Sequence, residues 1–150
     1  MAHTHTSLTY HAIFSTKNRD ATIKEEFHDR LFAYIGGIFD KFGGKLIRAG
    51  GTADHVHLLF QLDTTKSFAE VMRAIKANSS KWIHETFPDS GAFAWQSGYA
   101  AFTVSKSAMP DVTRYIENQQ EHHRTQSFED EFKAFLRRHE IEFDDRFVID

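Results

Sequence analysis

The spacing of apolar residues along the chain predicts short strands that alternate with longer helices. Residues 7–16 are rich in β-branched and aromatic residues, which is typical of a strand. Residues 22–42 carry apolar side chains at helical spacing, so a helix is expected there. Two strands are predicted next, at 45–50 and around 55–62, and the short turn between them favours an antiparallel hairpin.

The second half of the chain continues this alternation. A helix is predicted at about 67–87, a strand at 99–105, a helix at about 107–124 and a last helix at about 128–139. Ser107 can cap the third helix, with Pro110 in its first turn.

The order β-α-β-β-α-β followed by helices is that of the split βαβ, or ferredoxin-like (RRM-like), arrangement. We therefore expect an α+β fold with an antiparallel sheet and helices packed on one face. The other face is expected to be free for a ligand, a nucleic acid or another subunit. A single domain should span residues 1–150, with a frayed N-terminus at 1–6 and a helical tail at 126–150.

Composition and charge limit the classes of protein that fit this chain. It has 41% apolar residues, as globular domains do, and no cysteine, which excludes disulfides and thiolate metal sites. No run of about 20 apolar residues and no signal-peptide pattern is present, so we expect no membrane partner and a cytoplasmic location. The net charge of −3 argues against nonspecific wrapping of long nucleic acid. It divides into +2 for residues 1–116 and −5 for residues 117–150, so a polyanion site is expected in the first segment.

Two histidines separated by one valine stand in the predicted strand at 55–62. Residues i and i+2 of a strand share a face, so His55 and His57 are expected side by side, with the apolar residues between and after them turned to the core. Neutral imidazole is a common metal ligand, and buried imidazoles otherwise need hydrogen-bond partners. Two interpretations stay open, a shared metal ion or structural histidines. The same spacing at His3 and His5 falls in the predicted frayed end, where we assign it no role.

The third predicted helix offers partners for this pair. Tyr115 and Gln119 are four residues apart and so share one helix face. A glutamine carbonyl can complete a hard-metal site, and a tyrosine hydroxyl can attack a metal-polarised phosphorus, although a helical Tyr-x-x-x-Gln is ordinary by itself. His122 and His123 are adjacent and diverge by about 100°, so they are expected to form only a polar helix end. Asp54 is expected to point to the face opposite His55, as a turn residue or a support for the site.

The acidic segment that follows the third helix is expected to have no chemical role. An apolar stripe in it indicates packing or a subunit contact. The stripe consists of Phe128, Phe132, Phe135 and Leu136.

His55-Val56-His57, followed by Tyr115-Ile116-Glu117-Asn118-Gln119, resembles the motifs of the single-tyrosine HUH transposases, in which U is a hydrophobic residue. These are of the insertion-sequence 200/605 type and include the transposases associated with repetitive extragenic palindromes. The likeness begins at Tyr10-His11 and includes the stretches at 53–59 and 95–99. The order and spacing of the motifs in a chain of this length are specific, and the family's fold agrees with the strand order predicted above.

The resemblance implies a mechanism and the residues that carry it. His55, His57 and Gln119 would hold a Mg²⁺ or Mn²⁺ ion at the scissile phosphate. Tyr115, on a catalytic helix after the last strand, would attack phosphorus in single-stranded DNA. A 5′-phosphotyrosine link and a free 3′-OH would result, and reversal with another 3′-OH would join new DNA ends without ATP.

The resemblance also implies partners. We expect single-stranded DNA with hairpins, a homodimer whose active sites are shared between subunits, and a nucleoid-associated protein in the cytoplasm of a bacterium or archaeon. Basic residues that would otherwise be only solvated then become candidate phosphate contacts. The candidates are Lys17, Arg19, Arg48, Arg73, Lys76 and Lys81. Trp95 and Tyr99 are expected either to stack on an unpaired base or to pack in the core.

Two other functions compete with an active transposase. A catalytically inactive, domesticated hairpin-DNA-binding protein would not need all of His55, His57, Tyr115 and Gln119, and all four are present. A metal-dependent hydrolase of small phosphoesters with paired H-x-[ST] motifs would need a second motif copy, which the sequence lacks. The sequence therefore favours the transposase.

Overall fold

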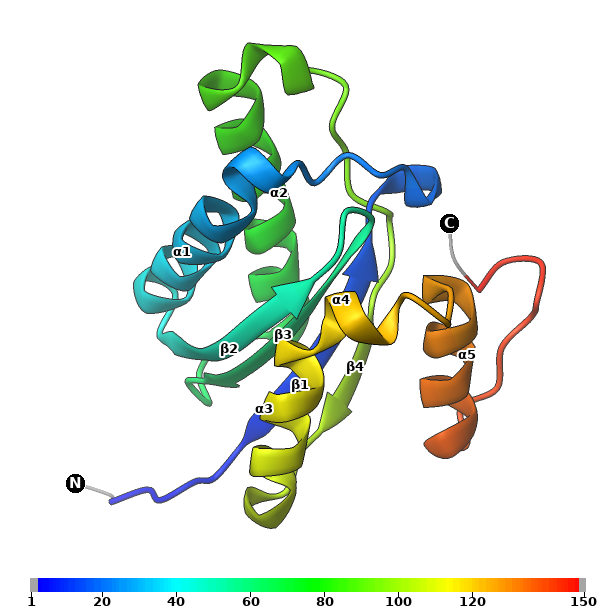
Figure 1. The fold of residues 1–150 in the computed structure, drawn as a ribbon. Helices are drawn as coiled ribbons and strands as arrows, with labels where there is room; N and C mark the ends of the chain where they lie inside the picture. The colour runs from blue at the N-terminus through cyan, green and yellow to red at the C-terminus, as the bar shows by residue number, and fades with distance from the viewer. Residues whose placement is uncertain (1–2, 149–150) are drawn as a thin grey trace.

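One antiparallel sheet organises the protein, for which a computed structural model describes residues 3–148. Its strands lie in the order β2-β3-β1-β4 (Figure 1). The strands are β1 (Thr9–Ser15), β2 (Gly44–Gly51), β3 (His55–Leu62) and β4 (Ala100–Thr103). The helices are α1 (Glu25–Lys41), α2 (Phe68–Thr86), α3 (Met109–Glu117), α4 (Gln119–His122) and α5 (Phe128–Arg138). The chain order β1-α1-β2-β3-α2-β4 confirms the predicted ferredoxin-like α+β class.

The two ends of the chain lie outside the sheet. Residues 3–8 are exposed and have no regular secondary structure. The frayed N-terminus at residues 1–6 stays a prediction. Residues 1–2 of that prediction, and residues 149–150 of the predicted tail, lie outside the described residues. Within residues 3–148, no helix is both long enough and apolar enough to cross a membrane.

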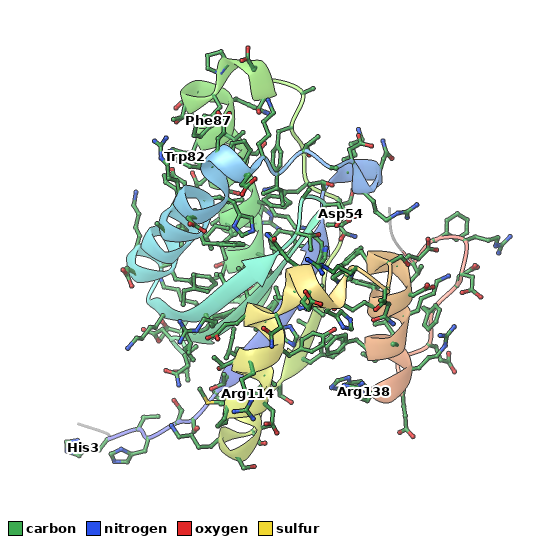
Figure 2. All side chains as sticks on the ribbon, in the orientation of Figure 1. His3, Asp54, Trp82, Phe87, Arg114 and Arg138 are labelled. Atoms are coloured by element: carbon green, nitrogen blue, oxygen red, sulfur yellow. The ribbon has the colours of Figure 1, made fainter. Side chains whose placement is uncertain are left out.

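Helices α1 and α2 cover one face of the sheet and bury the main core with it (Figure 1). The predicted alternation in β3 holds, because Val56, Leu58 and Phe60 are all buried in this core. Ser67 caps α2 by accepting a hydrogen bond from the N–H of Glu70. Figure 2 shows Trp82 and Phe87 on this side of the molecule, away from Arg114 on α3 and Arg138 on α5.

Helices α3 and α5 lie against the opposite face, so the prediction that this face would be free is wrong. A second apolar cluster joins the sheet to α5, as the Phe stripe of the acidic segment predicts for a packed helix. Its buried members are Ile13, Ala100, Phe102, Phe128, Phe132 and Leu136. This face was expected to be open because the sequence did not indicate where the last helix, α5, packs on the sheet.

Helix α3 approaches β2 closely at Gly50. An added Cβ at Gly50 would lie 2.2 Å from the carbonyl oxygen of Ile116, so only glycine permits this contact. Gly50 is the antiparallel partner of His57 in the β2–β3 ladder. The missing side chain therefore lets α3 lie directly over the strand pair that carries the histidines.

The predicted helix at 107–124 is divided at Asn118, whose φ of −98° and ψ of 19° are not helical. The N–H of Asn118 donates to the carbonyls of both Arg114 and Tyr115, which tightens the end of α3 before α4 starts at Gln119. Ser107 makes no capping hydrogen bond, because a 3₁₀ turn at Lys106–Ala108 precedes α3. Pro110 does lie in the first turn of α3.

Candidate active site

Strand β3 turns the side chains of His55 and His57 toward α3 and α5. Both residues are fully buried, and their ring centroids are 5.2 Å apart. They lie side by side on one sheet face, as the i, i+2 spacing predicts.

Each of these imidazoles is held through its Nδ1 atom. Nδ1 of His55 lies 2.7 Å from Oδ1 of Asp54, and Nδ1 of His57 lies 2.8 Å from Nε2 of His11. Asp54 is not on the opposite face as predicted, because β3 begins only at His55 and the Asp54 carboxylate turns back toward that ring. Both Nε2 atoms are thereby directed at the same point, an arrangement that fixes the tautomer of metal-binding histidines.

Helices α3 and α4 bring Tyr115 and Gln119 to the histidine pair within the same chain. Oε1 of Gln119 lies 2.8 Å from Nε2 of His55. The ring of Tyr115 lies edge-on to the ring of His57, with 5.8 Å between centroids. The structure therefore gathers all four residues that the sequence singled out as catalytic or metal-binding.

Glu131 of α5 lies at the centre of this cluster, although the sequence assigned its segment no chemistry. Its side chain is 1% exposed, and its Oε1 is 2.9 Å from Nε2 of His57. Its Oε2 accepts hydrogen bonds from the Tyr115 hydroxyl and, at 3.1 Å, from the amide of Gln119. A signal was present: Glu131 stands three residues after Phe128 and four before Phe135, so it is a charged residue on the apolar stripe.

His122 and His123 also reach the cluster, so their prediction as an uninvolved polar helix end is wrong. Nε2 of His123 lies 3.0 Å from Oε1 of Glu131, and Nε2 of His122 lies 3.4 Å from Oε2. Helix α4 ends at His122, and the two rings meet different oxygens of one carboxylate. Their angular divergence on a helix therefore does not separate them.

Burial and close contacts set the charge states in this cluster. Burial lowers the pKa of His57 to about 4 and that of His11 to about 3, so both rings are neutral at neutral pH. Burial would raise the pKa of the Glu131 carboxyl, but the neighbouring imidazoles of His123 and His57 outweigh it and the net pKa is lowered. Burial and the contact with Glu131 raise the pKa of the Tyr115 hydroxyl, which is therefore protonated in the free chain.

The donor atoms fit a divalent metal ion. One ligand atom each from His55, His57, His123 and Glu131 lie within 4.8 Å of one another. Adjacent ligands around a cation with bonds of about 2.1 Å are about 3.0 Å apart, and Oε1 of Glu131 lies 2.9 to 3.5 Å from the Nε2 atoms of the three imidazoles. Nε2 of His123 is buried and has no hydrogen-bond partner among the described residues, since Glu131 is close but misaligned. This group could therefore hold a metal ion.

A cavity of about 760 Å³ opens beside the cluster. It lies between the start of α1, the β2–β3 turn and the segment that joins α4 to α5, and Asp54 and His123 contribute to its wall. A substrate could approach the buried donors from this side.

The candidate phosphate contacts fall in two separate regions. Lys17 and Arg19 follow β1, and Arg48 lies on β2, where it pairs with Glu117 of α3 at 3.2 Å. Arg73, Lys76 and Lys81 lie on α2, which covers the opposite face of the sheet.

Lys76 and Trp95, which are also candidates for contact with nucleic acid, make contacts with buried or backbone groups of the protein itself. Lys76 donates to the carbonyls of Gln96 and Gly98, at 3.0 and 2.6 Å. Trp95 packs against Phe14 in the core and donates to Ser79, which confirms the core interpretation for Trp95.

The fold and the cluster together define a protein of the HUH class, in which a strand with two histidines faces a helix with a tyrosine. The family model described as "Transposase IS200 like" matches residues 4–119. The chain therefore belongs to the IS200-like transposase family. Two curated relatives, the transposases for insertion sequence element IS200 of Salmonella typhimurium and Salmonella typhi, are each 28% identical over 130 residues. Each match covers 81% of this chain and 82% of the relative.

Solved structures show the same fold. A protein from Deinococcus radiodurans R1, classed as a transposase, matches with a TM-score of 0.62 and 26% identity over 79% of this chain and 96% of its own. A REP-associated tyrosine transposase bound to a REP hairpin matches with a TM-score of 0.59 over 82% of this chain and 74% of its own. The second is 15% identical and supports the fold alone.

Proposed function

We propose that this chain cleaves and rejoins single-stranded DNA next to hairpins through a covalent bond to Tyr115. The observation that supports this most directly is that the Tyr115 hydroxyl contacts Glu131, which in turn contacts the Nε2 atom of His57. A nucleophile and a cation-binding group thus meet in one chain. Membership of the transposase family supports DNA as the substrate, and the hairpin bound by the REP-associated relative supports hairpins as the recognised feature.

The proposed reaction exchanges one phosphodiester oxygen for another. The Tyr115 oxygen bonds to phosphorus while the bond from phosphorus to the 3′ oxygen breaks. The hydroxyl gives up its proton and the departing 3′ oxygen takes one up, which leaves a 5′-phosphotyrosine and a 3′-OH. Attack by another 3′-OH reverses these changes and joins new ends.

His55, His57 and Gln119 are proposed to hold the divalent ion. When bound, Mg²⁺ or Mn²⁺ polarises the scissile phosphate and neutralises developing negative charge. The neighbouring residues have different roles. Asp54 orients the ring of His55 and His11 orients the ring of His57, in each case through Nδ1, and Gln119 presents its oxygen toward His55.

The six basic candidates are proposed to contact DNA phosphates. Arg19 and Arg48 form ion pairs with Glu129 of α5 and Glu117 of α3, and a DNA phosphate could replace these carboxylates. Lys17 lies two residues before Arg19 and is proposed to contact the same stretch of DNA. Arg73, Lys76 and Lys81 would serve a hairpin that extends around to α2. The salt dependence of hairpin binding tests each contact, and a slope left unchanged by a substitution removes that residue from the set.

A homodimer and nucleoid association in the cytoplasm of a bacterium or archaeon belong to the same proposal. The cluster assembled within one chain supports an active site that is complete without a residue from a second subunit. Dimerisation, where it occurs, would then serve to hold two DNA ends rather than to complete a site.

A covalent adduct is the expected outcome when the protein meets Mn²⁺ and hairpin-bearing single-stranded DNA from the regions flanking its gene. The adduct should survive a denaturing gel, and Tyr115→Phe should abolish it because no oxygen remains to attack phosphorus. Tyr34→Phe is the matched control, since Tyr34 stacks on Trp82 against the main core and should leave the yield unchanged. His57→Ala should remove metal-dependent cleavage but retain hairpin binding.

The same assay separates the two functions that remain. An adduct that persists in Tyr115→Phe would remove Tyr115 as the nucleophile. Tight hairpin binding by the unaltered protein with no adduct under any divalent ion would favour the inactive, domesticated DNA-binding protein instead.

A further inference from the structure

We propose that Glu131 and His123, which follow the tyrosine helix, are direct ligands of the divalent ion together with His55 and His57. This inference rests on the proposed metal-assisted function and assigns it ligands that the family motifs do not include. The ion would then be held by three imidazoles and one carboxylate of a single chain, with the Gln119 oxygen beside them.

The third imidazole is oriented in the same way as the other two. Nδ1 of His123 lies 2.5 Å from the carbonyl oxygen of Gln126, which can only accept, so Nδ1 carries the proton. Nε2 of the neutral ring is then a lone pair. His55 is in the same state because its Nδ1 donates to Asp54, and His57 can donate its Nδ1–H to His11. With His57 in that tautomer and His123 neutral, three lone pairs converge on one region.

The oxygens in that region are acceptors as well. Oε1 of Glu131 lies within 3.5 Å of Nε2 of all three rings, at 3.5, 2.9 and 3.0 Å for His55, His57 and His123. Acceptors at such distances repel one another unless a positive charge lies among them. Protonation of His123 could supply one charge, but it would leave the contact between His55 and the Gln119 oxygen as two acceptors at 2.8 Å. A divalent ion satisfies all of these atoms at once.

Burial of the carboxylate leads to the same conclusion. Glu131 is 1% exposed and sits on a helix face whose neighbours Phe128 and Phe132 are in the apolar cluster. An ionised buried carboxylate is costly unless it is paired or coordinates a metal. Its two oxygens have different partners: Oε1 faces the imidazoles, and Oε2 accepts a hydrogen bond from the Tyr115 hydroxyl. Glu131 would thereby link a bound ion to the Tyr115 hydroxyl.

Isothermal titration of the full-length, DNA-free protein with Mn²⁺ tests the assignment without using activity. Mn²⁺ is the probe because mixed imidazole and carboxylate ligands suit it better than Mg²⁺, which prefers oxygen. Glu131→Gln keeps the shape but removes the charge and should weaken Mn²⁺ binding by about tenfold or more, as should His123→Ala. Glu121→Gln, an exposed carboxylate paired with Arg124, is the control and should bind as the unaltered protein does.

Three results decide between the possible outcomes. If Glu131→Gln and His123→Ala bind Mn²⁺ as tightly as the unaltered protein while His57→Ala does not, the ligand assignment is overturned and the proposed function stands. If even His57→Ala binds unchanged, the proposed metal site itself fails. If Glu131→Gln does not fold, a crystal of the unaltered protein grown with Mn²⁺ decides: the anomalous peak should lie about 2.1–2.3 Å from Oε1 of Glu131, and a peak beyond bonding distance contradicts the assignment.

Discussion

At the scale of single residues, the cluster depends on atoms that face away from its centre. Asp54, His11 and the carbonyl of Gln126 each hold one imidazole by Nδ1, and each leaves Nε2 directed at Glu131. Asp54 is the only carboxylate among these three, and it also accepts from the Thr52 hydroxyl at 2.9 Å. A ring fixed in this way loses no rotational freedom when it binds an ion.

Asp54→Asn should therefore weaken Mn²⁺ binding by about 10- to 100-fold, although Asp54 is not itself a ligand. The amide can present its nitrogen to Nδ1 of His55 and reverse the tautomer, so that Nε2 carries the proton. Titration calorimetry measures the affinity, and Asp40→Asn on α1 is the matched control. Unchanged Mn²⁺ affinity in Asp54→Asn would show that the His55 orientation is set by other contacts.

At the scale of elements, the position of α3 decides whether Tyr115 reaches the histidines. Gly50 of β2 lies beneath this helix, and the carbonyl oxygen of Ile116, the residue after Tyr115, occupies the place where a side chain would be. Packing that leaves no room for a methyl group transmits even a small change to the neighbouring element.

Gly50→Ala should displace α3 and lower the yield of the covalent DNA adduct by more than about tenfold, since small misplacements of a nucleophile are costly. Overpacking should also lower the free energy of unfolding by about 1–3 kcal/mol. Gly37→Ala is the control, because a Cβ there meets no atom within 4 Å and should stabilise α1 slightly. Adduct gels and urea unfolding measure the two effects, and an unchanged adduct yield in Gly50→Ala would remove the steric argument.

Local sequence patterns predict the strands and helices and four residues of the cluster. The periods of 2 and 3.6 predict the strands and helices within a few residues, and they place His55 with His57 and Tyr115 with Gln119. Glu131 and His123 could not be placed in this way, because their positions depend on where α5 docks on the sheet. An apolar stripe predicts that a helix packs against the rest of the protein, but it does not predict which face of the sheet the helix covers.

At the scale of the whole molecule, the cluster draws on segments of one chain that run from His11 to Glu131. Strands β1 and β3 supply histidines, α3 and α4 supply Tyr115 and Gln119, and α5 closes the group over the second face of the sheet. Because these segments belong to one chain, we propose that the tyrosine of each chain serves the histidine pair of the same chain.

A mixture of two inactive variants tests this proposal. Tyr115→Phe and His57→Ala, co-expressed with different tags and purified together, should form no covalent DNA adduct, because neither chain holds a complete site. Each variant with the unaltered protein serves as the control for correct folding. Recovery of adduct in the doubly mutant mixture would show that the tyrosine of one subunit serves the histidines of another.

The place of Glu131 in the chain has a consequence for protein synthesis. Domains fold as the ribosome releases them, N-terminal part first. The sheet with both histidines and the tyrosine helix can form before α5 has been made, but the cluster gains its carboxylate only when residue 131 emerges. A chain that ends before residue 131 would therefore carry the proposed nucleophile, Tyr115, and the histidine pair without the Glu131 carboxylate that contacts both of them.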